Sequence, residues 1–498
     1  MKKRIVSIIL ALLMTAPSLA ACGESQINTE NETSSESSAA VNENAVTETT
    51  GELSDYDKRQ LIPDNLPAEN FNGEEFRIMT GNATEYITEL LSEELNGDAC
   101  NDAVYNRNIT VEDRFSVKLS VIEDDNPQEQ VKIFTTAGTD DAHVVGYKNY
   151  LSYVPITGGA LMNWLEAPYQ DLSQPWHNKL ANEGSTLNNI LYSICSDLSV
   201  TSMTYTYATF VNLDMLANYG ITSTELYNMV KEGKWTIDKT IELTDKMYTD
   251  TNGDGKRDLD DVYGYGYQIT NPADVWLTAF GGKVAEFDGT DVVVTFASDK
   301  TVSILEKLVD WHYNHPGFYV YPTQYDEEKY FLNEKLVMAP LRFATAYTTL
   351  RDMESVYTML PYPKWDEAQE GYYTNADDKF TAFGLPLTSA GNLNFVSIIY
   401  EAMCAESYKQ VFPAYYDQAL KGKYSSDATT AEMVDLIMAG RAFDFSFQFG
   451  ESCFQKLCYK IRDMLNAKST NLMSTYKGIE KALNKTLPRV LGKAYHFD

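Results

Sequence analysis

Residues 292–340 are VVVTFASDKTVSILEKLVDWHYNHPGFYVYPTQYDEEKYFLNEKLVMAP, and this stretch decides the expected fold class. Its two ends, 292–296 and 336–340, are short apolar runs of the kind that forms buried β-strands. Between them, apolar side chains recur at the spacing of one helical face, after a cap at Ser298 or Asp299. The face consists of Ile304, Leu305, Leu308 and Trp311. A strand, a helix and a second strand in succession predict an α/β fold.

Similar strand-like runs occur at 75–81, 141–147 and 262–267. Strands that alternate with helices predict α/β domains with mostly parallel sheets. In such sheets the ligand crevice lies off the carboxyl ends of the strands. The first candidates for a binding site are therefore the residues that follow the expected strands: Gly81, Asn82, residues 147–150, Asp197 and Arg342.

The composition excludes several functional classes. Of the 498 residues, 44% are hydrophobic, which is enough for one large core or two ordinary ones. The 40 Lys and Arg residues are outnumbered by 71 Asp and Glu residues, and the formal charge is −31. Because such a surface repels phosphates and anionic lipid headgroups, we expect no nucleic-acid partner.

The first 21 residues have the pattern of a signal peptide. Basic residues at 2–4 precede an apolar run that is too short to span a bilayer. The run ends in LAAC at 19–22, which resembles the lipobox of bacterial lipoproteins. The resemblance implies that Cys22 is lipidated and becomes the first mature residue, on the extracellular face of the bacterial cell membrane. The alternative is ordinary cleavage near Ala21.

Residues 22–64 form the expected disordered tether. Glu, Ser, Thr and Asn dominate this segment, and it contains too little apolar surface to offset the entropy lost on ordering. No later stretch is long and apolar enough for a transmembrane helix. The sequence therefore predicts a globular body that is held at a membrane by a lipid anchor only.

Five segments between about 70 and 450 carry a family resemblance. They are FVNLDMLANYGI at 210–221, GKWTID at 233–238, WLTAFGG at 276–282, FLNEKLVM at 331–338 and LPYP at 360–363. In this order they resemble landmarks of the extracellular solute-binding proteins of ABC importers. Within that family, the chain is similar to the carbohydrate-type members of the maltose-binding-protein fold group.

The resemblance implies two α/β lobes, joined by a hinge that the chain crosses several times, with the ligand between them. One lobe is expected to comprise 65–205 and 360–405, and the other 206–359 and 406–498. The region beyond Glu451 matches no landmark. The implied function is that of a monomeric receptor, which binds a sugar or oligosaccharide and presents it to the permease subunits of an ABC importer.

Sugar binding needs flat apolar faces against the C–H side of the ring and planar polar groups for the hydroxyls. The candidate platforms are Trp276, Trp365, Tyr147 and Tyr207, and the candidate hydroxyl partners are Asn82, Asp197 and Arg342. For each aromatic residue the alternative role is packing in the core or between the lobes.

The sharpest local motif is DTNGDGKRDLDD at 250–261, which fits a calcium loop of EF-hand type. The expected ligands are side-chain oxygens of Asp250, Asn252, Asp254, Asp258 and Asp261, and the carbonyl of Lys256. The closing Asp261 is shorter than the usual glutamate, and a strand rather than a helix is expected to follow. We therefore predict a structural calcium site, with a solvated Asp/Asn/Gly turn as the alternative.

Enzyme signatures in the sequence are thin. The five histidines form no metal-protease pattern, and neither a nucleophile elbow nor a phosphate-binding loop occurs. We therefore expect no catalytic residues. Two alternatives stay open: a surface glycan-degrading enzyme, because carboxylates are plentiful, and a receptor for a non-sugar solute such as a peptide or a phosphorylated compound.

Overall fold

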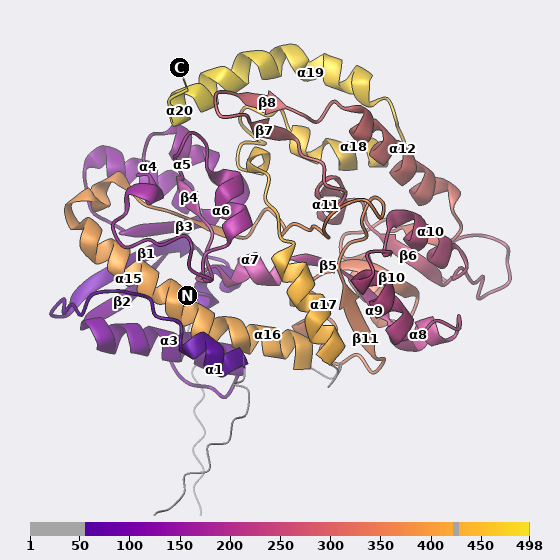
Figure 1. Cartoon of the computed structure of the whole chain (residues 1–498), viewed down its shortest axis with the longest axis horizontal. Coiled ribbons are helices and arrows are strands. Elements are labelled where there is room, and N and C mark those ends of the chain that lie inside the picture. Colours follow the sequence, from indigo (N-terminus) through magenta and orange to yellow (C-terminus); the bar gives the residue numbers. More distant parts are fainter. Residues whose placement is uncertain (1–54, 422–427, 498) are drawn as a thin grey trace, which may run out of the picture. The chain divides into compact units, whose positions relative to one another are not determined.

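The computed structural model describes residues 55–421 and 428–497 (Figure 1). The expected signal peptide at 1–21, the candidate lipidation site Cys22 and the tether up to residue 54 lie outside the described residues. None of the helices in the described ranges has the length and apolar character that a membrane crossing demands.

The first of two large sheets has five strands in the order β2-β1-β3-β12-β4. Figure 1 labels four of them, β1 to β4. The strands are β1 (Glu74–Gly81), β2 (Val117–Asp124), β3 (Val144–Lys148), β4 (Ser193–Ile194) and β12 (Thr381–Gly384). β1 pairs in parallel with β2 and β3, whereas β12 is antiparallel to β3 and β4. With its covering helices this sheet forms what we call the first lobe. The helices are α2 (Thr84–Thr88), α3 (Ala99–Phe115), α4 (Pro127–Ala137), α5 (Tyr153–Thr157), α6 (Lys179–Ser185), α7 (Val200–Thr204) and α15 (Leu393–Glu406).

The second large sheet also has five strands, in the order β11-β5-β10-β6-β9. The strands are β5 (Tyr207–Asn212), β6 (Tyr263–Tyr267), β9 (Phe318–Val320), β10 (Leu336–Arg342) and β11 (Tyr357–Leu360). With its helices it forms what we call the second lobe. The helices are α8 (Leu213–Ala217), α9 (Ser223–Lys231), α10 (Ile237–Asp245), α11 (Asn271–Ala279), α12 (Asp299–Asn314), α13 (Asp326–Leu332) and α14 (Phe343–Tyr347).

The helix expected inside 292–340 is present as α12, and Ser298 is its cap: the Ser298 hydroxyl accepts a hydrogen bond from the N–H of Thr301. The strand expected at 336–340 is the central strand β10. The run at 292–296 forms only the short strand β8 (Val292–Val294). It pairs with β7 (Ala285–Phe287) in a separate two-stranded sheet.

The expectation of mostly parallel sheets is wrong. In the second sheet β10 and β6 are parallel, as are β6 and β9, but β5 is antiparallel to both β10 and β11. The antiparallel strands β5 and β12 are those that directly follow a passage of the chain from one sheet to the other. Parallel neighbours are normally joined by a crossover helix that packs on the sheet. A strand that enters from the other sheet lacks this connection and can pair in the antiparallel direction.

Two connections between the lobes lie side by side and form the hinge. One runs from β4 to β5, and the other from β11 to β12. They are joined by backbone hydrogen bonds from Tyr207 N to Asn375 O, at 3.1 Å, and from Asp377 N to Tyr205 O, at 2.9 Å. The chain thus crosses between the lobes at least twice before its C-terminal region.

The C-terminal region contacts both lobes. Its helices are α16 (Phe412–Lys421), α17 (Ala428–Ala439), α18 (Lys460–Asn466), α19 (Leu472–Leu487) and α20 (Lys493–Tyr495). α18 and α19 pack on α12 of the second lobe, whereas α20 packs on α5 of the first. The Tyr192 hydroxyl of the first lobe donates to the carbonyl of Ala494. The expected placement of all of 406–498 in the second lobe is therefore too simple.

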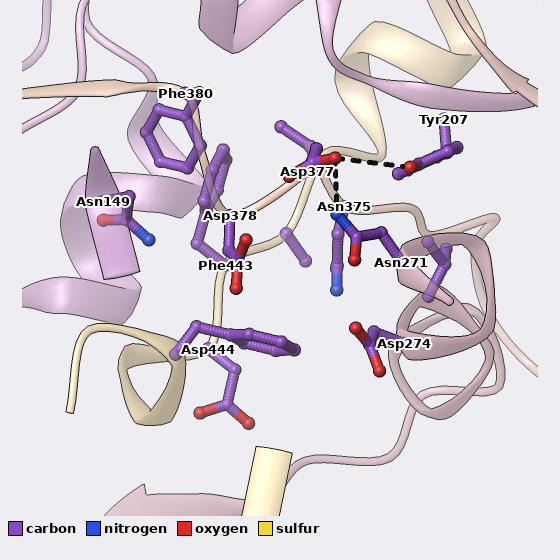
Figure 2. Close-up of a pocket in the computed structure, with 14 residues that line it drawn as sticks. Asn149, Tyr207, Asn271, Asp274, Asn375, Asp377, Asp378, Phe380, Phe443 and Asp444 are labelled. Carbon is purple, nitrogen blue, oxygen red and sulfur yellow. Dashed lines mark hydrogen bonds between the residues drawn. The ribbon is translucent and has the colours of Figure 1, made fainter. Parts of the chain in front are cut away.

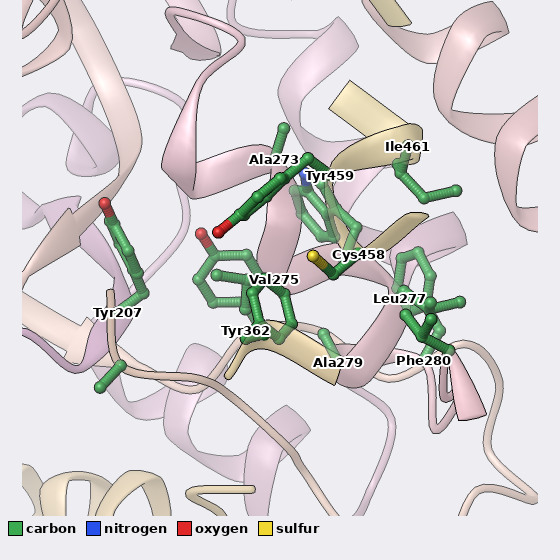
Figure 3. Packing of buried hydrophobic residues seen from close by; sticks show 14 of the residues in the cluster. Tyr207, Ala273, Val275, Leu277, Ala279, Phe280, Tyr362, Cys458, Tyr459 and Ile461 are labelled. Atoms are coloured by element: carbon green, nitrogen blue, oxygen red, sulfur yellow. The ribbon is translucent and has the colours of Figure 1, made fainter. Parts of the chain in front are cut away.

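Part of the core connects this region with α11. Figure 3 shows side chains of α11 beside Tyr362 of the hinge connection and beside Cys458, Tyr459 and Ile461 of the C-terminal region. The C-terminal segment is therefore built into the core beside the hinge.

Candidate ligand-binding site

A pocket of about 410 Å³ lies where the hinge connections, α11 and the C-terminal region meet (Figure 2). This volume includes space that is open to solvent, and the enclosed part of the pocket is only about 20 Å³. Five chain segments line it: Asn149 directly after β3, Tyr207 at the start of β5, 271–275 at the start of α11, 375–380 of the hinge, and 442–447. Both lobes and the hinge therefore contribute side chains.

Asp377 is the best-connected polar group of the pocket. Its Oδ2 accepts hydrogen bonds from Asn271 Nδ2 at 2.7 Å and from the Tyr207 hydroxyl at 3.4 Å (Figure 2). Arg342 Nη1 lies 3.9 Å from the same oxygen. Asp377 thus connects the hinge with β10 and α11 of the second lobe.

Arg342, at the end of β10, lies against the ring of Tyr205, with 5.0 Å between the guanidinium carbon and the ring centroid. Burial by itself lowers the pKa of Arg342, but Tyr207 and Asp377 outweigh this effect and raise that pKa above its ordinary value. Arg342 lines a small adjoining pocket, which it shares with Tyr207 and Asp377.

The C-terminal region supplies a second arginine. Arg462 Nη1 lies 3.0 Å from Oδ2 of Asp274 and 2.9 Å from Oδ1 of Asn271. Its guanidinium carbon is 4.3 Å from the ring centroid of Tyr459. Burial raises the pKa of Asp274 well above its ordinary value, although Arg462 opposes this shift.

Asp378, beside Asp377, accepts a hydrogen bond from the Tyr459 hydroxyl. Burial, and then the charge of Asp377, raise the pKa of Asp378 to about 7. The pocket therefore contains a carboxyl group that titrates near neutral pH.

A third small pocket, with about 40 Å³ of enclosed space, lies in the first lobe between the end of β1 and the end of β3. Asn82 and Tyr147 line it, together with Lys148, whose ammonium lies 5.5 Å from the ring centroid of Tyr86. Tyr147 is 2% exposed and its hydroxyl pairs with Ser193 Oγ at 2.9 Å, so it is not an open stacking platform.

Of the seven expected ligand residues, four line these three pockets. Tyr207 and Arg342 share one of them, and Asn82 and Tyr147 share another. The remaining three are Asp197, Trp276 and Trp365.

Asp197 is 7% exposed inside the first lobe. It is not among the residues that line the three pockets described above. Burial raises its pKa to about 7, with an opposing effect of Arg441. Its position after β4 thus places it in the core and not at the cleft.

Trp276 is fully buried, and this corrects its expected role as a platform. Its Nε1 donates to the Tyr267 hydroxyl at 2.6 Å, and its ring packs at 4.8 Å against Tyr362. Trp365 packs against Phe280 at 5.3 Å, with the Lys307 ammonium 4.7 Å from its ring. It is not among the residues that line the three pockets described above. Both tryptophans are packing residues in this structure.

Four pocket residues have no counterpart among the sequence-based candidates: Asn271, Asp274, Asp377 and Asp378. The same holds for Tyr459 and Arg462, which contact Asp378 and Asp274. The polar run TNADDK at 374–379, between an apolar segment and β12, is a signal that points to the two hinge aspartates. Tyr459 and Arg462 lie beyond Glu451, where the sequence offered no landmark.

The loop at 250–261 makes its sharp turns at Gly253 and Gly255, both with φ of 74°. Its side-chain oxygens accept hydrogen bonds from the loop backbone: Asp250 from Gly253 and Gly255, and the buried Asp261 from Thr251. Asn252, Asp254 and Asp258 accept similar bonds, from residues 254, 256 and 260. In the described part of the chain, no three His, Cys, Asp or Glu side chains converge on a metal position. Calcium binding by this loop stays a prediction.

No protein-family model matches this chain, and no curated protein matches it. Solved structures match this chain over most of its length. One is the maltose/maltodextrin-binding domain MalE from Bdellovibrio bacteriovorus bound to maltotriose, with 12% identity and a TM-score of 0.51 over 84% of this chain and 99% of that one. Another is the GacH receptor of Streptomyces glaucescens, solved unliganded and with acarbose and an acarbose homolog. It has 13% identity and a TM-score of 0.51 over 83% of this chain and 99% of that one. The chain has the two-lobed α/β fold of these binding proteins.

Proposed function

We propose that this chain is the solute-binding receptor of an ABC importer, which binds a sugar or oligosaccharide between its lobes and delivers it to membrane permease subunits. The observation that carries the proposal is the pocket at the hinge. Its polar side chains come from both lobes and from the hinge itself, so a bound solute would contact parts of the chain that move relative to each other.

The chemistry of the lining supports a polyhydroxylated ligand. Asn149, Asn271 and Asn375 offer amide groups, and Asp274 and Asp378 offer carboxyl oxygens. Planar groups that donate or accept in pairs suit the hydroxyls of a sugar ring. The two comparison structures, of the same fold, have maltotriose and acarbose as ligands.

The proposed mechanism is hinge closure without a chemical step. Contacts from both lobes exist together only in the closed state and are lost on opening, which permits tight capture followed by release. We propose a monomeric receptor on the extracellular face of the cell membrane, anchored by lipid at Cys22.

The first experiment is a thermal-unfolding screen of the purified chain over mono- and oligosaccharides, because a ligand that binds only the folded state raises the melting temperature. Small-angle scattering with a positive ligand should show a smaller radius of gyration. A matched reducing-sugar assay covers the alternative of a glycan-degrading enzyme: release of reducing ends from the same oligosaccharides would contradict a pure receptor.

Two variants connect the screen to the pocket. Arg342→Gln removes the positive charge that lies beside Tyr207 and Asp377. We expect this variant to bind saccharide at least ten-fold more weakly. Arg351→Gln makes the same change at an exposed position outside the pockets and should leave the affinity unchanged. Equal affinities of the two variants would exclude the adjoining pocket, which Arg342 lines with Tyr207 and Asp377, as part of the sugar site.

A further inference from the structure

The end of the chain docks on the first lobe through side-chain hydrogen bonds. The Tyr192 hydroxyl donates to the carbonyl of Ala494 at 2.8 Å. Asn188 Nδ2 donates to the carbonyl of Tyr495 at 2.8 Å and to that of His496 at 3.2 Å. The last carbonyls of a helix have no partner within that helix. Two side chains of the first lobe thus cap three successive carbonyls at the end of α20.

A row of aromatic rings extends this contact toward the second lobe. The ring of Tyr495 is 1% exposed, and its centroid lies 5.2 Å from that of Tyr192, directly before β4. On its other side it lies 6.2 Å from Phe497. Phe497 stacks on Phe287 of β7, with 5.1 Å between the centroids and 16° between the ring planes. Because β7 follows α11 of the second lobe along the chain, the row joins segments of both lobes.

The beginning of the same C-terminal region is fixed to the second lobe. The Tyr313 hydroxyl of α12 donates to the carbonyl of Leu465 at 2.8 Å. Asn466 Nδ2 donates to the carbonyl of Ile269, between β6 and α11, at 3.0 Å. The C-terminal region therefore has one anchor on the second lobe, at α18, and another on the first lobe, after α20.

A single helix separates the two anchors. It is α19, which has 16 residues and is therefore roughly 24 Å long at 1.5 Å per residue. Figure 1 shows it extending from the side of α12 to α20. Because an α-helix keeps its length, the lobes cannot separate far while both anchors hold. The π-helical turn Pro488–Gly492 joins α19 to α20, and a bend at such a turn permits limited motion.

We infer that residues 494–497, which we call the clasp, limit how far the two lobes separate when no solute is bound. The hinge connections allow the lobes to rotate, and the clasp joins the lobes at a second place. Molecules whose lobes are already close together bind a solute more tightly, because less free energy is spent on reaching the binding-competent conformation. The clasp itself goes beyond the proposed receptor function, and its effect on lobe separation can be measured without any ligand.

The first variant removes the side-chain donors. Asn188→Gly combined with Tyr192→Phe eliminates all three hydrogen bonds to the clasp, and glycine readily adopts the φ of 49° at position 188. Asn189→Gly is the matched control, because this exposed neighbour has a φ of 58° and its side chain makes none of these bonds. A second variant ends the chain at Lys493 and lacks the whole clasp.

Small-angle scattering of the unliganded proteins tests the inference. We expect a larger radius of gyration for the double variant and for the shortened chain, and the unchanged radius for Asn189→Gly. Thermal unfolding verifies that each variant is folded at the temperature of the scattering measurement. If the shortened chain does not fold, the double variant decides, because it retains the buried ring of Tyr495.

Isothermal titration calorimetry with maltotriose measures the consequence for binding. We expect the double variant to bind maltotriose at least three-fold more weakly than the unchanged protein does, since a smaller fraction of its molecules has the lobes close together. Asn189→Gly should bind maltotriose as the unchanged protein does.

The two measurements separate the clasp from the proposed function. Equal radii for the unchanged protein and the folded clasp variants would overturn the clasp, and so would an equal increase in Asn189→Gly. If the clasp variants expand but the unchanged protein does not bind maltotriose, the clasp is supported and a maltotriose receptor is contradicted. If they expand and bind maltotriose with unchanged affinity, the clasp limits the lobes but its contribution to binding is refuted.

Discussion

Arg462 Nη1 lies 3.0 Å from Oδ2 of Asp274, so the C-terminal region holds a carboxyl group of the second lobe at the pocket wall. The Arg462 side chain is 24% exposed and that of Asp274 is 8% exposed. The contact therefore connects a segment without any recognised landmark to the candidate ligand site.

Arg462→Met should lower the free energy of unfolding by about 1–3 kcal/mol, because it leaves the buried Asp274 carboxyl without its partner. Denaturant unfolding measures the effect. Adding Asp274→Asn should recover part of the loss, since a neutral amide is less costly to bury. Lys179→Met, at an exposed pair, is the control and should change stability by less than about 0.5 kcal/mol. Equal losses in Arg462→Met and Lys179→Met would contradict a structural role for the contact.

Trp276→Ala should destabilise the fold by about 3–5 kcal/mol, because the side chain is fully buried and its removal leaves a cavity. Denaturant unfolding again provides the measurement. Trp365→Ala, at a partly buried position against Phe280, should cost less. A folded Trp276→Ala variant of unchanged stability that had lost sugar binding would restore the tryptophan as a ligand platform.

Asp197→Asn should change how stability depends on pH. Burial raises the pKa of Asp197 from 3.8 to about 7, so between these values the folded state binds more protons than the unfolded state. The Asp197 contribution to the free energy of unfolding therefore falls as pH rises through that window. The variant lacks this contribution, and from about pH 5 to about pH 7 it should lose less stability than the unchanged protein, by on the order of 1 kcal/mol per pH unit. Asp352→Asn is the control, and identical pH profiles for all three proteins would refute the shift.

Calcium at millimolar concentration should raise the melting temperature if the loop at 250–261 binds it, because the ion stabilises only the folded loop. A chelator should reverse the shift, and Asp254→Ala should abolish it. Asp352→Ala, outside the loop, should keep the response. Melting curves of the unchanged protein that are the same with calcium and with chelator would reject the site.

Cys22→Ala should release the protein from the membrane fraction into the medium, because it removes the residue that we propose carries the lipid. Cell fractionation followed by detection of the protein measures this. Cys100→Ala, at a buried cysteine of α3, is the matched control and should stay with the membrane. Retention of Cys22→Ala at the membrane would exclude a lipid anchor at this position.

Part of the candidate site could be predicted from the sequence. Arg342 could be predicted because it follows a strand of strong apolar character, and Tyr207 because it is one of the aromatic residues suited to stack on a sugar. Trp276 was misplaced because α11 is buried on nearly all sides. Such a helix has no polar face to indicate which of its residues point toward a cleft.

The sequence by itself determined the local elements and the family resemblance. Apolar periodicity and a capping serine act over a few residues, so α12, β6 and β10 could be located before any contact between distant parts was known. Only the tertiary structure decided which groups meet at the hinge. Asp274, Asp378 and Arg462 come from three separated segments, and their proximity follows from how the lobes and the C-terminal region pack together. A pattern within one segment cannot indicate contacts between distant segments, because burial and charge pairing depend on the whole fold.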